Sequence, residues 1–442
     1  MTKRSNTRRR FLAASGVTAF SAMAGCMDRV NSAIPNGDDS SNGSESDGGG
    51  DSDADGYESP ELTVETEYNS REEFRQPGEQ IGDFENLDDW EIIDGEAEAD
   101  KEVAFAGDQS LKLTAEDSNN VIVSKSIDTM DMTDLDISMA VRTSSPGNVA
   151  IDIMLYDIYG GYAHNQLRSV SYGTDEIGWF RTCPGVFAES TTPLERDVVD
   201  EIRIMIHNTG DAEVWVDDLR VHEKPEKGYV VLSWDDGIED FYEPAGPLHD
   251  EYDVNAVQAV VRQWTRGQRE GVMTIDQIKE RQEAGDQIVA HGTHTHLTDV
   301  DALDDSLSTD KNWAVKEGLE GGHYLVFPHN SFDDRVLDVV SKYYYAGGFN
   351  QSGNVNLTGV HGFDPLVLPR TIGNDLDIAM QCVDNAAKHR QCTVLNFHAF
   401  DQDNTMNQDE YEQLLQHIND TEDVEVIDFD DLWTMRREGH ER

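Results

Sequence analysis

The chain has 442 residues, enough for two domains that each bury their own core. Its 88 acidic residues outnumber 34 basic ones and give a formal net charge of -54, spread along the whole length. Contacts with phosphates need clustered Lys and Arg, so this charge argues against a nucleic-acid partner. Uniform acidity instead indicates a halophilic protein that stays soluble in concentrated salt, where self-repulsion is screened. Recruitment of cations or of basic partners is the alternative interpretation.

The first 26 residues have the three parts of an export signal. A basic head precedes an apolar run from Phe11 to Ala24, which is too short for a membrane-spanning helix. Residues 7–12 (Thr-Arg-Arg-Arg-Phe-Leu) resemble a twin-arginine signal, and residues 23–26 (Met-Ala-Gly-Cys) resemble a lipobox. The resemblance implies that Cys26 is lipidated and anchors the exported protein to the outer face of the membrane. A chance cysteine is the alternative.

Residues 27–78 have the composition of a disordered tether. Between Asp38 and Asp55 there are seven acids and no base, and most other residues are Ser or Gly. Such a segment has nothing to pack, so we expect it to hold the rest of the chain away from the membrane.

The chain's four cysteines are too few for a disulfide scaffold. With Cys26 assigned to the anchor, at most two of Cys183, Cys382 and Cys392 can pair, and the sequence does not determine which. The alternative is burial as small apolar residues.

Residues 79–224 contain short alternating apolar runs separated by turn residues. No stretch keeps a helical period for more than two turns, so the pattern predicts an antiparallel β-sandwich. The predicted strands include 110–114, 121–124, 135–142, 149–156, 202–206 and 214–221.

The ends of this segment resemble the jelly-roll carbohydrate-binding modules, in which the first and last strands lie side by side. The residues that carry the resemblance are 83–85, Trp90, 107–111 and 214–219. It makes Glu85 and either Asp217 or Asp218 candidates for a structural calcium ion, which prefers carboxylate oxygens, with solvated acids as the alternative. Aromatic residues that could stack on a sugar, or could instead pack in the core, are Trp179, Tyr156, Tyr159 and Tyr162.

Residues 225–442 alternate strand with helix after a short charged link, which indicates an α/β domain. A buried strand at 229–232 runs into Ser-Trp-Asp-Asp-Gly at 233–237. Thr274 with Gln277 has the form of a helix start, and Gly285 fits its end. Strands are expected at 287–290 and 424–427. The residues Tyr411, Leu414, Leu415 and Ile418 would form one apolar helix face.

Three histidines follow the strand at 287–290, namely His291, His294 and His296. Imidazole is the commonest protein ligand of metals, and two rings with one carboxylate leave positions open for water and substrate. Asp235 and Asp236 can supply such a carboxylate and a second function, because neighbouring side chains of a strand point to opposite sides. Solvated histidines on a turn are the alternative.

The order of these features resembles the polysaccharide deacetylases, the NodB-homology domain of carbohydrate esterase family 4, over residues 229–433. The first motif is 233–237, with Trp234 in place of Phe. The second is 291–296, where the family spaces its ligands four apart and this chain offers gaps of two, three and five. The later motifs resemble 325–332, 368–370 and 394–398. The resemblance implies a deformed (β/α) barrel.

By this resemblance Asp235 is the general base and His398 the general acid, and Arg370 orients Asp235 unless it is only a surface ion-pair partner. Asp236 is a metal ligand, joined by two of the three clustered histidines; His291 and His296 are the preferred pair, and His294 could replace either. The residues expected to contact substrate are Trp234, Leu395, Phe327 and Pro328.

The resemblance implies metal-dependent hydrolysis of N-acetyl or O-acetyl groups on a cell-surface polysaccharide, with the sandwich holding the polymer. Zinc is the expected metal, and cobalt, nickel or manganese would also fit. Two other functions stay open. One is a surface-anchored polysaccharide-binding protein without activity, which the irregular histidine spacing and a missing arginine before the third motif favour. The other is hydrolysis of a small non-sugar C–N bond.

Overall fold

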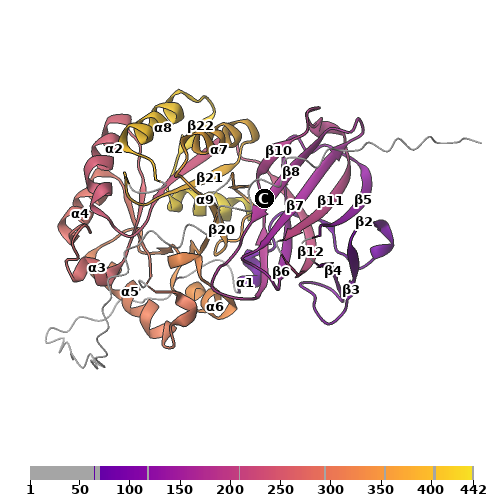
Figure 1. Ribbon diagram of the computed structural model, residues 1–442, viewed down its shortest axis with the longest axis horizontal. Coiled ribbons are helices and arrows are strands. Elements are labelled where there is room, and N and C mark those ends of the chain that lie inside the picture. The colour runs from indigo at the N-terminus through magenta and orange to yellow at the C-terminus, as the bar shows by residue number, and fades with distance from the viewer. Residues whose placement is uncertain are drawn as a thin grey trace, which may run out of the picture. The chain divides into compact units, whose positions relative to one another are not determined.

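The computed structural model describes Val64 and residues 70–440, apart from gaps at 117–118, 209, 293–294, 353–354 and 402–404. The predicted export signal and Cys26 lie outside the described residues. Two antiparallel sheets are followed by a curled, mostly parallel sheet with helices around it (Figure 1), which confirms the predicted fold class. Within the described ranges, no helix is long and apolar enough to cross a membrane.

The first two sheets form the predicted β-sandwich. Their strands are β1 (Glu79–Gly82), β2 (Trp90–Asp94), β3 (Glu96–Asp100), β4 (Ser110–Ala115), β5 (Val121–Met130), β6 (Leu135–Thr143), β7 (Val149–Asp157), β8 (Tyr162–Arg168), β9 (Ile177–Thr182), β10 (Val186–Glu189), β11 (Val199–Asn208) and β12 (Ala212–Glu223). One sheet has the order β3-β4-β12-β6-β9, and β1 pairs with β12, so the first and last strands are neighbours as expected. The other has the order β10-β8-β7-β11-β5-β2.

The sandwich core is formed by the side chains that point to the inner face of each strand. On β7, Ile151, Ile153 and Leu155 are at most 2% exposed and belong to one apolar cluster. Successive side chains of a strand point to opposite faces, so every second residue of β7 faces the other sheet.

The third sheet carries the second domain. Its strands are β13 (Gly228–Trp234), β14 (Val257–Val260), β15 (Gln287–Ala290), β16 (Tyr324–Leu325), β17 (Ala346–Gly347), β18 (Phe349–Ser352), β19 (Leu357–Thr358), β20 (Leu368–Ile372), β21 (Cys392–Phe397) and β22 (Val424–Val426). The order is β17-β16-β15-β14-β13-β21-β20-β18, with β22 beside β13 and β19 antiparallel to β21. Val230, Val231 and Leu232 of β13 are fully buried, as is typical of a parallel strand covered on both faces.

The helices of the described chain are α1 (Arg71–Phe74), α2 (Gly246–Tyr252), α3 (Arg262–Arg266), α4 (Ile275–Ala284), α5 (Leu303–Glu317), α6 (Asp334–Tyr343), α7 (Leu376–His389), α8 (Gln408–Asp420) and α9 (Phe429–His440). Helix α4 begins with a reciprocal capping box between Thr274 and Gln277 and ends at Gly285, whose φ is 114°. Helix α8 buries the four apolar residues predicted for its inner face. Both predictions are confirmed.

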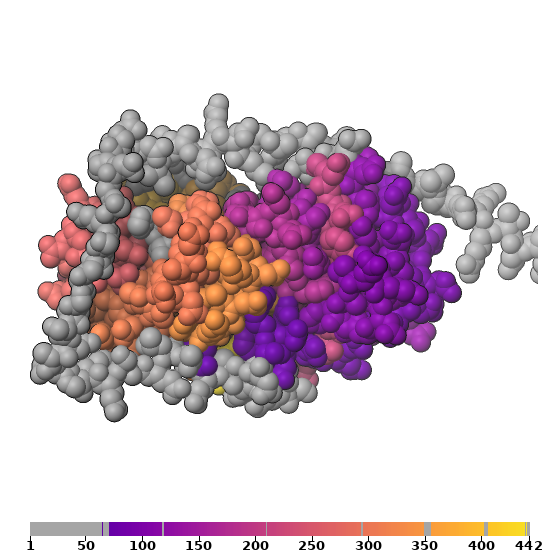
Figure 2. All heavy atoms as spheres, turned by 90° about the horizontal axis from the view of Figure 1, so that it is seen from below, coloured from indigo at the N-terminus to yellow at the C-terminus, as the bar shows by residue number. Residues whose placement is uncertain are grey.

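Residues 70–78 differ from the predicted tether. Phe74 in α1 is buried and contacts Trp433 edge to face, with 6.2 Å between ring centroids. Arg71 forms an ion pair with Asp338 at 2.7 Å. Figure 2 shows the indigo start of the described chain lying against the orange segment of the second domain. An aromatic contact and ion-pair and hydrogen-bond contacts of the arginines thus attach this stretch to the folded chain.

The cysteines Cys183, Cys382 and Cys392 are buried and form no disulfide within the described part of the chain. Burial raises the pKa of Cys382 to about 11 and raises those of the other two thiols further. Their placement agrees with the alternative of small buried apolar residues.

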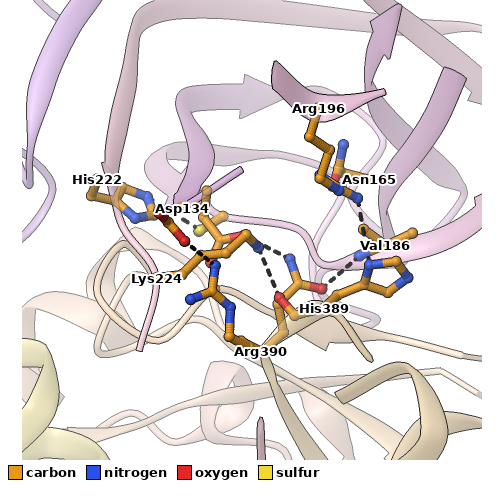
Figure 3. A network of polar contacts seen from close by, with 12 residues as sticks. Asp134, Asn165, Val186, Arg196, His222, Lys224, His389 and Arg390 are labelled. Carbon is orange, nitrogen blue, oxygen red and sulfur yellow. Dashed lines mark hydrogen bonds and ion pairs between the residues drawn. The ribbon is translucent and has the colours of Figure 1, made fainter. Parts of the chain in front are cut away.

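Lys224 opens the short charged link that the sequence predicts between the domains, and its side chain is only 3% exposed. The ammonium of Lys224 forms an ion pair with Asp136 and donates to the carbonyl of His389 at 2.9 Å (Figure 3). Gln391 Nε2 donates to the same Asp136 at 2.8 Å, and Gln391 Oε1 accepts from the N–H of Val186 at 2.9 Å. The sandwich and the second domain therefore share buried polar contacts.

Replacing Lys224 with Ala should lower the free energy of unfolding by about 3 kcal/mol, because Asp136 is left charged and buried without its cation. Chemical denaturation followed by tryptophan fluorescence measures this loss. Lys227→Ala is the control, since it removes an ion pair with Glu425 whose side chains are 43% and 51% exposed, and it should leave the midpoint unchanged. Equal losses in the two variants would contradict a buried role for Lys224.

Candidate active site

Asp235 is the first residue after β13 and is held by an arginine. Its side chain is 2% exposed, and its N–H donates to the carbonyl of Phe397 at 3.0 Å. Nη1 and Nη2 of Arg370 donate to its two carboxylate oxygens at 2.8 and 3.0 Å, a bidentate pair. Arg370 is 1% exposed on β20 and reaches across β21, so it is not a surface ion-pair partner.

The charge of Asp235 depends on this contact. Burial by itself would raise the pKa of Asp235, but the Arg370 guanidinium, with His291 and His398, holds that pKa well below the usual range of a carboxyl. Asp235 is therefore an anion throughout the neutral range.

Asp236 turns away from its neighbour because the backbone leaves the strand in a left-handed conformation. Its φ is 71°, and that of Gly237 is 70°. The Asp236 side chain is 31% exposed, and its Oδ1 lies 3.5 Å from Nε2 of His291. The two adjacent carboxylates thus have different partners and different access to solvent.

His291 follows β15 and has one ring nitrogen available. Its backbone N–H donates to the carbonyl of Val260 at 3.0 Å, and its Nδ1 lies 3.0 Å from the carbonyl of Val326. A carbonyl can only accept, so Nδ1 carries a proton, and Nε2 is the ring nitrogen that faces Asp236. This is the tautomer and orientation of a metal-binding histidine.

Charges around His291 and Asp236 reinforce each other. Burial would lower the pKa of His291, but Asp235 and then Asp236 raise it overall. Burial opposes the charge of Asp236 as well, yet the hydrogen bond from His291 keeps the pKa of Asp236 below its ordinary value. The surroundings of Asp236 therefore favour a cation close to it.

The other clustered histidines lie differently. His294 is outside the described residues, and the ring of His296 stacks on His329, with centroids 4.6 Å apart and an interplanar angle of 8°. Among the residues that the structure describes, no group of three or more His, Cys, Asp or Glu side chains could close around a metal ion. Asp236 and His291 lie where two ligands of one metal ion could be. That His296 is the third ligand remains a prediction.

His398 lies beside Asp235 because of the pairing register of strands β13 and β21. Trp234 pairs with Phe397 in the parallel ladder, so the residues that follow them, Asp235 and His398, leave the sheet together. Nε2 of His398 lies 3.7 Å from Asp235 Oδ2, and its side chain is 40% exposed. A half-exposed imidazole beside a fixed carboxylate can give a proton to a group bound from solvent.

His329 was missed by the sequence analysis. It lies in the segment matched to the third motif, is exposed, and has a φ of 55°. The next residue, Asn330, has a φ of 49°, and Asn takes such a left-handed conformation more readily than most residues. The signal that could have pointed to His329 is its place directly after the Phe-Pro pair of that motif.

The residues predicted to contact substrate are buried. Trp234 is 1% exposed, and its Nε1 faces the Tyr411 hydroxyl at 3.3 Å within a cluster of aromatic rings. Phe327 is stacked on Phe332, with 4.5 Å between their centroids. All four predicted side chains pack in a core of this structure and are not available to a ligand. They are Trp234, Leu395, Phe327 and Pro328.

The proposed calcium ligands in the sandwich are occupied by hydrogen-bond donors. Asp217 accepts from the backbone N–H groups of residues 105 and 106 at 2.9 and 3.1 Å, and burial raises its pKa to about 6. Asp218 forms ion pairs with Arg181 and Arg220. Glu85 accepts a backbone N–H at 2.7 Å. These contacts engage all three carboxylates with protein partners, and a calcium ion at this place stays a prediction.

Comparison with known proteins relates part of the second domain to a known family. The family model for polysaccharide deacetylase matches residues 222–348. None of the curated proteins compared with the chain matches it.

Several solved structures are similar in part. The deacetylase PplD of Streptococcus pyogenes is 22% identical over 32% of this chain and 62% of its own, with a TM-score of 0.27. A putative polysaccharide deacetylase from Mycobacterium smegmatis is 12% identical over 48% of this chain and 92% of its own, with a TM-score of 0.39. A family 16 carbohydrate-binding module is 20% identical over 32% of this chain and 97% of its own, with a TM-score of 0.23. These low TM-scores add nothing to the family match.

Arg370→Met should lower the free energy of unfolding by about 3 kcal/mol at neutral pH, because Asp235 loses its only bidentate partner. The depressed pKa of Asp235 contributes stability that is present above the unfolded pKa of about 4 and lost as pH falls through the lower folded value. The deficit of the variant should therefore shrink as pH falls from 7 toward 2.

Denaturation curves across this pH range give the measurement. The control is Lys342→Met, which removes an exposed ion pair with Asp304. Its free energy of unfolding should stay close to that of the wild type at every pH. A deficit for Arg370→Met that stays constant with pH would mean that its cost does not come from the charge of Asp235.

Proposed function

We propose that this chain, which carries a polysaccharide deacetylase domain, hydrolyses N-acetyl or O-acetyl groups on a polysaccharide at the cell surface in a metal-dependent reaction. The family match supports deacetylation of polysaccharide in general. The finer proposal rests on the division between two adjacent carboxylates, with Asp235 bound by Arg370 and Asp236 turned to His291.

Asp235 and His398 supply the proton transfers. A water that attacks an acetyl carbonyl loses a proton, and the fixed anion of Asp235 would accept it as the new C–O bond forms. When the C–N or C–O bond of the acetyl group breaks, the leaving amine or alcohol needs a proton, which His398 would donate. The Arg370 pair keeps Asp235 charged but also makes it a weak base, so it acts best on a water that is already acidified.

The residues around Asp236 fit the divalent ion that the family implies. Asp236 and His291 would hold it, with a third ligand from residues 294–296, and zinc, cobalt, nickel and manganese all suit imidazole and carboxylate. When bound, the ion would lower the pKa of a water and polarise the acetyl carbonyl. The half-exposed Asp236 and the half-exposed His398 leave this side of the turn open to a polymer from solvent.

The sandwich is a candidate for holding the polymer. The rings of Tyr156 and Tyr162 contact each other at 5.0 Å, and the guanidinium of Arg203 lies 4.0 Å over Tyr156. Tyr159, in the turn that follows β7, is 72% exposed. Planar groups of this kind stack on sugar rings. A lipid at Cys26 would keep this surface and the active site at the outer face of the membrane.

A second function has a specific observation in its favour. In the described part of the chain, Asp236 and His291 have no third side chain that could complete an ion site. A polysaccharide-binding protein without activity would fit an incomplete site, and the same experiment decides between the two functions.

Asp235→Asn should reduce acetate release from N-acetylated oligosaccharides by about a thousandfold or more and leave one divalent ion bound, because the base is lost but the ligands remain. Asp236→Asn is the matched variant one residue away, and it should lose both the ion and the activity. Enzymatic assay of acetate and elemental analysis of the purified proteins measure the two effects.

A wild type without bound ion and without acetate release from acetylated chitin oligomers or xylan would favour the binding protein. Undiminished turnover in Asp235→Asn would remove Asp235 as the base.

A further inference from the structure

We infer that the sandwich is part of the active site, because its loop at residues 169–173 (the clamp loop) holds the turn at residues 327–331 (the His329 turn) in place. Ser171 and Asn330 are the positioning residues. This inference rests on the proposed function and assigns the sandwich a second task besides holding polymer.

The His329 turn lies at the active site. Its preceding residue, Val326, accepts from the ring of the candidate ligand His291 at 3.0 Å, and the N–H of Val326 donates to the carbonyl of Ala290 at 2.9 Å. The ring of His329 stacks on His296 at 4.6 Å. An exposed imidazole beside the clustered histidines is in a position to contact a bound sugar or acetyl group.

The backbone of the turn needs support from outside. His329 and Asn330 have φ values of 55° and 49°, two consecutive left-handed residues of which neither is Gly. Each costs about 1 kcal/mol, and such conformations persist only where surrounding contacts fix them. The supporting contacts decide where the His329 side chain lies.

The clamp loop supplies these contacts. Ser171 is fully buried, and its Oγ donates to the carbonyl of Phe332 at 2.7 Å and accepts from the N–H of Phe332 at 3.1 Å. Asn330 Nδ2 donates to the carbonyl of Val170 at 3.1 Å. The N–H of Tyr172 donates to the carbonyl of Asn330 at 3.0 Å. Asn330 of the left-handed pair and Phe332, two residues further on, are therefore bonded to the sandwich.

The two segments are too close for larger residues. A Cβ on Gly173 would stand 1.8 Å from Ser331 Oγ, and one on Gly178 would stand 2.4 Å from Asp334 Oδ2. On its other side, Ser331 Oγ lies 2.8 Å from the Thr298 hydroxyl, which follows the histidine cluster. The His329 turn is thus fixed between the sandwich and the segment that carries His296.

Positioning of the His329 turn and binding of polymer lead to different kinetics with a short substrate. If the sandwich only bound polymer, weakening its clamp loop would leave turnover of a short substrate unchanged. If the clamp loop positions the His329 turn, turnover of a short substrate should fall while its binding changes little, since small misplacements at a reacting centre cost up to about a hundredfold.

The test uses the full chain and a trimer of N-acetylglucosamine. Ser171→Ala removes the hydroxyl that bonds to Phe332, and Asn330→Gly keeps the left-handed backbone accessible but removes the bond to Val170. Both variants should lower kcat by about tenfold or more, with KM within about twofold of the wild type. The matched control, Ser145→Ala, removes a sandwich hydroxyl that donates to the carbonyl of Asp211 at 2.9 Å, and it should leave kcat unchanged.

A second measurement does not depend on activity. Hydrogen exchange of the backbone amides in residues 326–334 should be faster in Ser171→Ala and Asn330→Gly than in wild type or Ser145→Ala. Unchanged exchange in both variants would overturn the inference, as would unchanged kcat on the trimer in an active wild type. If the wild type releases no acetate from any substrate, the proposed function fails, and the exchange measurement alone decides whether the clamp loop positions the turn.

Discussion

The buried pair of Asp235 and Arg370 is the interaction on which the site depends. Two charged groups in a covered sheet are costly to desolvate, and a bidentate geometry with both partners nearly fully buried is what offsets that cost. The pair fixes Asp235 at the end of the central strand β13. It leaves Asp236, the next residue, free to turn left-handed toward His291 and solvent. One strand end therefore offers an anion for proton transfer and a ligand for a cation.

Much of this arrangement could be predicted from the sequence, because it depends on local pattern. The apolar run before Asp235, the capping box of α4 and the inner face of α8 are short-range signals, and the structure shows each of them. The order of motifs indicated a parallel sheet, and parallel strands bring the residues after their carboxyl ends to one edge. The proximity of Asp235, His291 and His398 follows from that topology.

The remaining features depend on contacts between distant segments, which composition does not encode. Lys224 lies in a charged stretch, yet its partner Asp136 is 88 residues away in the sandwich. The same holds for Asp218, whose ion-pair partner Arg181 is 37 residues away in the chain. The third motif could have pointed to His329, but the place of its side chain depends on the sandwich loop that bonds the turn, a contact that the motif does not encode. Strand β3, with the sequence Glu-Ala-Glu-Ala-Asp, is too acidic to suggest a strand without its neighbour β4.

The most direct test of the division between the two carboxylates is anomalous X-ray scattering from a crystal of the full chain loaded with zinc. We expect a peak within bonding distance of Asp236 and His291 Nε2, at about 2.0–2.2 Å, with Asp235 still bound by Arg370 and not bonded to the ion. A peak bonded to Asp235 with the Arg370 pair broken, or no peak at this turn in zinc-loaded protein, would contradict it.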